Sequence, residues 1–116
     1  MEEKLYLKNL KPEERNAIQR DIAKEIDATV ADIHAGVYDQ ELKDGGIEYA
    51  KELLPPDSPW TIPSGQQLSG LEIALITLVA KEGIKVTDRV LTDLWTKIVF
   101  PRIRQRWGAR VSRSPA

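Results

Sequence analysis

Five arginines and no acidic residue mark the last seventeen residues of the chain, FPRIRQRWGARVSRSPA. The arginines are Arg102, Arg104, Arg106, Arg110 and Arg113. A basic run with an interleaved aromatic residue, here Trp107, is typical of phosphate-backbone contact combined with base stacking. The five arginines are therefore predicted to bind an anion or a nucleic acid.

A row of carboxylates offers a second possible chemistry. Glu14, Asp21, Glu25 and Asp32 are spaced so that they fall on one face of a helix. Aligned carboxylates can bind a metal or act as acid and base. However, His34 is the sole histidine, and the outer face of a surface helix is ordinarily charged. We therefore interpret the row as a solvated face, and we predict no catalytic residue, no metal site and no cofactor.

The net charge of −1 hides an asymmetry between the two halves of the chain. Residues 1–60 hold 14 acidic and 8 basic side chains, whereas residues 61–116 hold 4 and 9. Such polarity can indicate an anionic partner for the basic half. It can equally mean that the halves face each other, with the arginine side chains paired to the carboxylate row. The second interpretation needs no partner.

Turn signals divide the chain into four expected helices. Isoleucine and valine recur at spacings of three and four from Ile18 to Val37, which predicts an amphipathic helix over about residues 12–35. Further helices are expected at about 46–54, 69–82 and 88–107, with a proline-rich loop at 55–65.

The segment 69–82 leaves almost no polar face. A helix that is apolar nearly all round is typical of the centre of a bundle or of a partner interface. Its β-branched residues leave an alternative open, an α+β fold with 71–80 as a buried strand. The predicted fold class is all-α, a single bundle domain over 1–107 followed by a basic tail over 108–116.

Pro101 falls inside the last helical pattern, where it should kink or end the helix. Beyond it the apolar positions change face, because Phe100, Ile103 and Trp107 group away from the preceding stripe. This change predicts packing on a second surface, which belongs to this chain or to another. Trp60, in the proline-rich loop, is either a lid on the core or a docking residue. These four apolar residues are the predicted partner-binding set.

Composition limits the compartment and the class of protein. The chain has no cysteine, so it has no disulfide framework and no thiolate metal site, which fits a reducing compartment. The N-terminal residues are charged and lack the apolar core of a signal peptide. The longest apolar stretch is about half of the roughly 20 residues that a bilayer requires. We expect a cytoplasmic protein without a membrane span.

These observations favour a small non-catalytic protein–protein interaction protein: an adaptor, an accessory subunit, or an antitoxin- or phage-type partner. It would present an apolar helical face to another protein or to a second copy of itself. The alternative is weak, sequence-nonspecific nucleic-acid binding through the arginine-rich segment. A third option is attachment at a membrane surface through Trp107 and its arginines.

Overall fold

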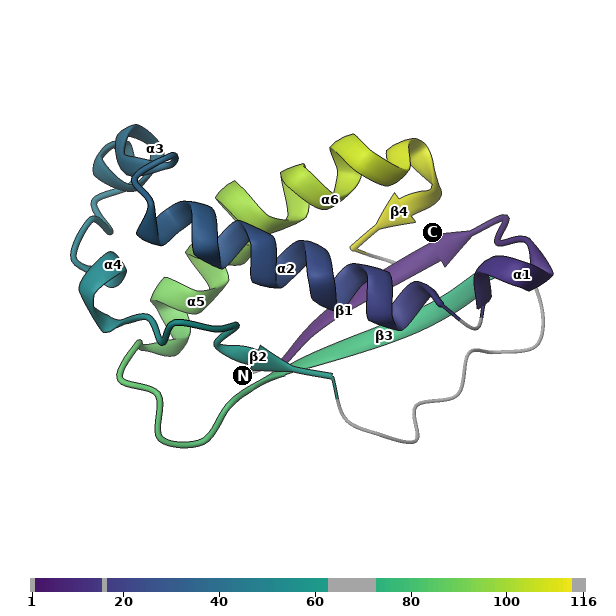
Figure 1. Ribbon diagram of the computed structural model, residues 1–116, viewed down its shortest axis with the longest axis horizontal. Coiled ribbons are helices and arrows are strands. Elements are labelled where there is room, and N and C mark those ends of the chain that lie inside the picture. Colours follow the sequence, from purple (N-terminus) through teal and green to yellow (C-terminus); the bar gives the residue numbers. More distant parts are fainter. Residues whose placement is uncertain (1, 16, 63–72, 114–116) are drawn as a thin grey trace.

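A computed structural model describes residues 2–15, 17–62 and 73–113, and it shows an antiparallel sheet packed against helices (Figure 1). The first elements are β1 (Glu2–Lys8), α1 (Pro12–Arg15), α2 (Ile18–His34), α3 (Asp39–Asp44), α4 (Ala50–Leu53) and β2 (Trp60–Thr61). The remaining elements are β3 (Ile73–Ala80), α5 (Asp88–Leu94), a π-helical turn (Trp95–Val99), α6 (Phe100–Trp107), a 3-10 turn (Gly108–Arg110) and β4 (Val111–Ser112).

Within the described residues, four strands make the sheet, in the order β2-β3-β1-β4. β1 and β3 are its long central pair, and their register places Glu2 opposite Val79 and Lys8 opposite Ile73. The two edges are short, since β2 and β4 have two residues each. Along β1, Leu5 and Leu7 are fully buried while the residues between them are not, so the sheet has one core face.

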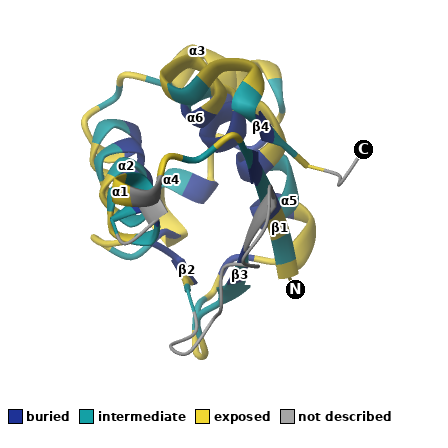
Figure 2. Cartoon of the chain, turned by 90° about the vertical axis from the view of Figure 1, so that its right-hand side faces the viewer, coloured by how far each residue is buried: buried dark blue, intermediate teal, exposed yellow. Residues whose placement is uncertain are grey.

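The core lies between this face and the helices. α2 contributes the stripe that its spacing predicted, and Ile18, Ile22, Ile26, Val30 and Ile33 are all buried. Buried residues of β1 and β3 belong to the same cluster as those of α2, α5 and α6. Figure 2 shows α2 and α6 lying to one side of the strands. In the described part of the chain, α2 and α6 thus pack on the core face of the sheet.

The prediction of an all-α bundle is wrong, because β3 occupies Ile73–Ala80 where a central helix was expected over 69–82. The alternative of a strand within 71–80 is the one that the structure has. An apolar run of this length fits a buried helix or a buried strand equally well by periodicity. The pairing of β3 with β1 decides the matter, and that contact joins segments about seventy residues apart.

Other boundaries were predicted with mixed success. The helix expected over 12–35 corresponds to α1 and α2, with residue 16 outside the described residues. The helix expected over 46–54 is shorter, α4, and α3 was not expected at all. The loop expected over 55–65 contains β2, and its residues 63–65 lie outside the described part, as do 69–72 of the expected central helix.

The segment 88–107 is helical throughout, and Pro101 neither ends nor breaks it. A π-helical turn precedes the proline, and the backbone N–H of Phe100 bonds to the carbonyl of Trp95, five residues back. A π turn holds more residues than an α turn, so it changes the phase of the apolar positions that follow. This change explains why the apolar face shifts near Pro101 while Ile103 still enters the same core.

The C-terminal segment continues the fold past residue 107, where we expected the helical domain to end. Val111 is buried and pairs with Leu7 as part of β4, so residues 111 and 112 belong to the sheet. Gly108, between α6 and β4, has a φ of 68°, a conformation that L side chains rarely adopt. No helix in the described part of the chain is both long and apolar enough to cross a bilayer.

Candidate interaction surfaces

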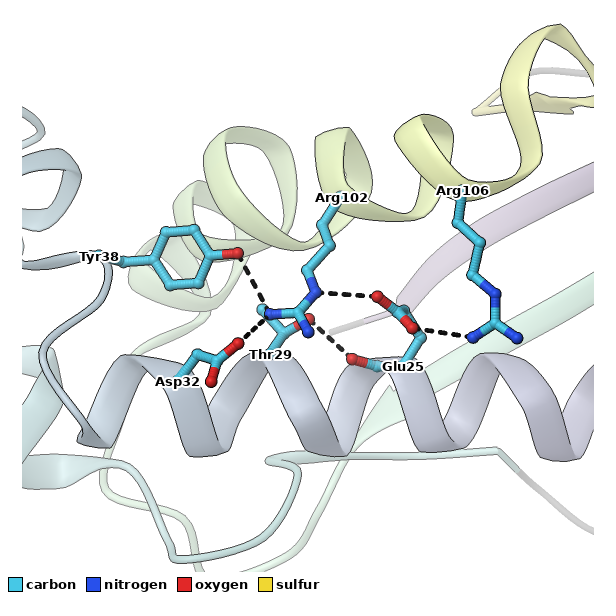
Figure 3. Close-up of polar contacts among 6 residues, drawn as sticks. All are labelled: Glu25, Thr29, Asp32, Tyr38, Arg102 and Arg106. Carbon is cyan, nitrogen blue, oxygen red and sulfur yellow. Dashed lines mark hydrogen bonds and ion pairs between the residues drawn. The ribbon is translucent and has the colours of Figure 1, made fainter.

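The arginines of α6 face the carboxylate row of α2, and they form a network with it (Figure 3). Arg102 Nε donates to Glu25 Oε1 at 2.8 Å, and its Nη1 donates to Asp32 Oδ2 and to the hydroxyl of Tyr38. Arg106 Nη1 donates to the other oxygen of Glu25 at 2.9 Å. The interpretation that the two charged halves pair with each other is confirmed for these side chains.

Burial and hydrogen bonding act in opposite directions on the network. Burial alone would raise the pKa of Glu25, but the hydrogen bonds from Arg102 and Arg106 outweigh it and lower that pKa. Burial alone would lower the pKa of Arg102, while bonds to Glu25, Asp32 and Tyr38 raise it. Glu25 and Arg102 therefore both stay charged at neutral pH. The network therefore joins α2 to α6.

Two arginines beyond α6 are also engaged within the chain. Arg110 Nη2 donates to Glu14 Oε2 at 2.9 Å, and this bond lowers the pKa of Glu14. Arg113 lies 3.9 Å from Glu3 and over the ring of Phe100. Four of the five arginines predicted to bind an anion thus have a carboxylate neighbour already.

Arg104 differs from the other four, because its exposed side chain has no ion-pair partner among the described residues. Together with Lys97 it borders a surface groove of about 440 Å³, which is also lined by Ile98 and Pro101. The groove is also lined by Arg102, which is paired with carboxylates of α2, and by the carboxylate of Glu41. Its lining therefore has little attraction for a polyanion, since counterion release grows with each phosphate contacted.

The predicted partner-binding residues lie largely inside the molecule. Ile103 is 0% exposed, Trp60 4% and Phe100 9%. Trp60 packs edge-on against Trp95, with ring centroids 5.9 Å apart. Trp107 is half-buried against the core, beside the Arg106 guanidinium. The structure thus places Trp60, Phe100 and Ile103 in the core, and of the four predicted residues only Trp107 is partly exposed.

The second face of the sheet, which we call the outer face, is the larger candidate. Directly opposed residues of an antiparallel pair project to the same side, and successive residues alternate. By the register of β1 and β3, the outer face carries Glu2, Lys4, Tyr6 and Lys8 of β1 and positions 73, 75, 77 and 79 of β3. Among the outer-face residues whose side chains the structure describes, neither Tyr6 nor Val79 belongs to the core cluster or to the partly buried residues packed against it.

The two central strands differ in character on the outer face. β1 places Lys4, Tyr6 and Lys8 there, as expected for a solvated surface. β3 has isoleucine, leucine, threonine and valine at its four outer positions, so its sequence is apolar on both faces except at Thr77. The described side chains Thr77 and Val79 are half-buried. Strands of this composition are typical of sheets with both faces covered.

Residues that could do catalytic or metal chemistry are not gathered in the described part of the chain. The imidazole Nε2 of His34 lies 2.8 Å from the carbonyl oxygen of Pro55, so the ring connects the end of α2 to the loop after α4. Among the described residues, no three histidine, aspartate or glutamate side chains are placed to hold one metal ion.

The outer face was missed because it exists only once β1 is recognised as a strand. The available signal was the alternation in EEKLYLK. In a strand, Leu5 and Leu7 project to one side and the flanking lysines project to the other. Once β1 is a strand, a second strand is needed to pair with it, and the apolar run at 73–80 then supplies a partner.

Comparison of the chain with protein-family models, with curated proteins and with solved structures gives no match in any of the three.

Proposed function

We propose that the chain is a non-catalytic protein–protein interaction protein that docks another polypeptide on the outer face of its sheet. One observation carries this proposal: the sequence of β3 is apolar at every position except Thr77, whereas the described helices pack on the face of the sheet that holds Leu5, Leu7, Ile76 and Leu78. Full burial of a valine, leucine or isoleucine side chain contributes about 1.5–3 kcal/mol. Val79 is already half-buried, so covering it contributes less than this full amount, before the entropic costs of binding are subtracted.

The surface differs from the apolar helical face that we first expected. The segment 69–82 forms no such helix in its described residues, and the apolar positions lie on a strand instead. Nucleic-acid binding through the arginine-rich segment gains no support, because four of its five arginines contact carboxylates of this chain.

A pair of matched valine variants tests the proposal. Val79→Gln removes apolar surface from the outer face without a change of net charge, and Val37→Gln does the same at a valine that is 62% exposed elsewhere. Because apolar contact drives both self-association and dye binding, we expect the parent chain to bind a hydrophobic dye or to self-associate in light scattering. Val79→Gln should reduce the signal and Val37→Gln should leave it unchanged.

Thermal unfolding of both variants checks that they remain folded. A monomeric parent chain that binds no dye would remove the basis of the proposal. The same conclusion would follow if the two valine variants changed the signal equally.

A further inference from the structure

We propose that the exposed side of α4, together with the cavity beside it, is a second docking surface. It binds a basic segment of another protein that carries one apolar anchor residue. This surface includes no residue of the outer face of the sheet, so it goes beyond the proposed function and does not depend on it. Exposed apolar side chains, an adjoining cavity and unpaired carboxylates support the assignment.

α4 and the turn that precedes it direct apolar side chains both inward and outward. Ile47, Ala50 and Leu54 are buried in the core, at spacings of three and four. On the other side, Tyr49 is 51% exposed and Leu53 is 36% exposed. These two residues are four apart in consecutive helical turns, so they lie next to each other on one face. They form an exposed apolar pair.

A cavity of about 380 Å³ adjoins this helix near the C-terminal end of α2 (Figure 1). It is lined by Ala31 and His34 of α2 and by Leu54 and Pro56, which follow α4. The imidazole Nε2 of His34 lies 2.8 Å from the carbonyl oxygen of Pro55, and this hydrogen bond joins the two walls. A largely apolar hollow of this kind suits one aliphatic or aromatic side chain of a partner.

The exposed side of α4 also carries two carboxylates. Glu48 and Glu52 are exposed, and neither has an ion-pair partner among the described residues. Each directly precedes one member of the exposed apolar pair, so the carboxylates and the apolar side chains form two adjacent columns. The lysine of this helix, Lys51, is already paired with Asp39 at 3.2 Å. The free charge beside the apolar pair is therefore negative.

This arrangement of charge favours a basic segment as the occupant. Lysine or arginine side chains of the partner would pair with Glu48 and Glu52, while an apolar neighbour enters the cavity. Complementary charge around an apolar contact fixes the register of a partner, and like charge opposes association. An acidic peptide, a nucleic acid or an anionic lipid surface would meet like charge at both carboxylates.

A second copy of the chain is disfavoured for two reasons. Arg102, Arg106, Arg110 and Arg113 already have carboxylate neighbours within the chain. A two-fold contact through α4 would also bring the free carboxylates of both copies together, because the same patch meets itself in such a contact. These charges favour a different protein as the partner.

A displayed library of peptides of about twelve residues tests the inference, with the purified chain as bait. Each peptide keeps one central leucine, while the three positions on either side are varied among Lys, Gln and Glu. We expect Lys to be enriched about threefold or more over Glu at two of the varied positions, since exposed ion pairs are individually weak. Enrichment should fall in about 1 M salt, because screening weakens such pairs.

Charge-reversed baits provide the specific contrast. Glu48→Lys/Glu52→Lys should reverse the preference and enrich Glu. Glu13→Lys/Glu82→Lys changes the net charge equally at two exposed glutamates outside α4, and it should keep the preference for Lys. Selection without a charge preference, or a preference that both double variants change equally, would overturn the inference.

Two single substitutions separate this surface from the outer face of the sheet. Leu53→Gln should lower the recovery of Lys-containing peptides, because it removes apolar contact, whereas Val79→Gln should leave recovery unchanged. Thermal unfolding checks that each variant remains folded. If Leu53→Gln leaves recovery unchanged, the inference fails, whatever Val79→Gln does to self-association or dye binding. A parent dimer that Leu53→Gln dissociates would identify a second copy as the occupant and would also overturn it.

Discussion

Replacement of Arg102 by methionine removes the centre of the network between α2 and α6. Methionine keeps the apolar stem but loses the guanidinium, and with it the bonds to Glu25, Asp32 and Tyr38. Glu25 keeps one partner, Arg106. The side chain of Glu25 is only 16% exposed, so the loss of its bond to Arg102 costs more than the loss of a surface pair.

The magnitude follows from the exposure of each partner. A hydrogen bond to a charged group contributes about 1.5–3 kcal/mol, and we take the low end for Glu25 because solvent still reaches the pair. The Asp32 side chain is 41% exposed, so its bond adds only about 0.5 kcal/mol, and the tyrosine hydroxyl adds a similar amount. Arg102→Met should therefore lower the free energy of unfolding by about 2–3 kcal/mol, which for a chain of this length corresponds to a fall in Tm of about 8–12 °C.

Urea and thermal unfolding, followed by circular dichroism, measure this difference. Arg104→Met is the matched control, because Arg104 is exposed on the same helix and has no ion-pair partner among the described residues. It should change the free energy of unfolding by less than about 0.5 kcal/mol. Equal effects of the two substitutions would refute the view that the network stabilises the fold.

Three further predictions follow from the same contacts. The hydrogen-bonded Glu25 has a folded-state pKa below its ordinary value of 4.5, so its contribution to stability is present above that pH and is lost as the pH falls through the folded-state pKa. Glu25→Gln should therefore reduce the loss of unfolding free energy upon acidification, as measured by urea titrations over about pH 5 to 3. Gly108→Ala should cost about 1–3 kcal/mol in the same assay, because φ is 68° there. Deletion of 111–116 should lower Tm, since it removes the buried Val111 from the sheet.

Each of these predictions has a result that would contradict it. An unchanged acid titration of Glu25→Gln would show that the network does not couple to protonation at that carboxyl. Full stability of Gly108→Ala would mean that the turn before β4 relaxes without strain. A deletion variant as stable as the parent would show that the domain ends before β4, as the sequence alone suggested.

The features that were predicted correctly are local or depend on simple complementarity. The spacing of Ile22, Ile26 and Ile33 specifies the buried side of α2 regardless of its neighbours. The pairing of α6 with α2 was one of two interpretations that the charge asymmetry left open, the other being an anionic partner for the arginines. Both arguments need only helix geometry and charge.

The sheet could not be predicted in the same way, because its evidence is non-local. The run Ile73–Ala80 is apolar at every position except Thr77, so neither a 3.6-residue nor a two-residue period stands out. β1 has a clear alternation, but a strand becomes stable only with a partner, and β3 lies far along the chain. The outer face depends on that pairing, so it could not be predicted either.

The central claim is that the outer side of β3 is accessible in the isolated chain. The absence of native cysteine makes single-cysteine variants unambiguous probes, and the rate of thiol labelling in dilute, monomeric protein measures accessibility. Val79→Cys should react within about tenfold of Val37→Cys, whereas Ile76→Cys on the core face should react only as fast as the protein opens. Protection of Val79→Cys equal to that of Ile76→Cys would show that the chain covers this face itself, and the account would be contradicted.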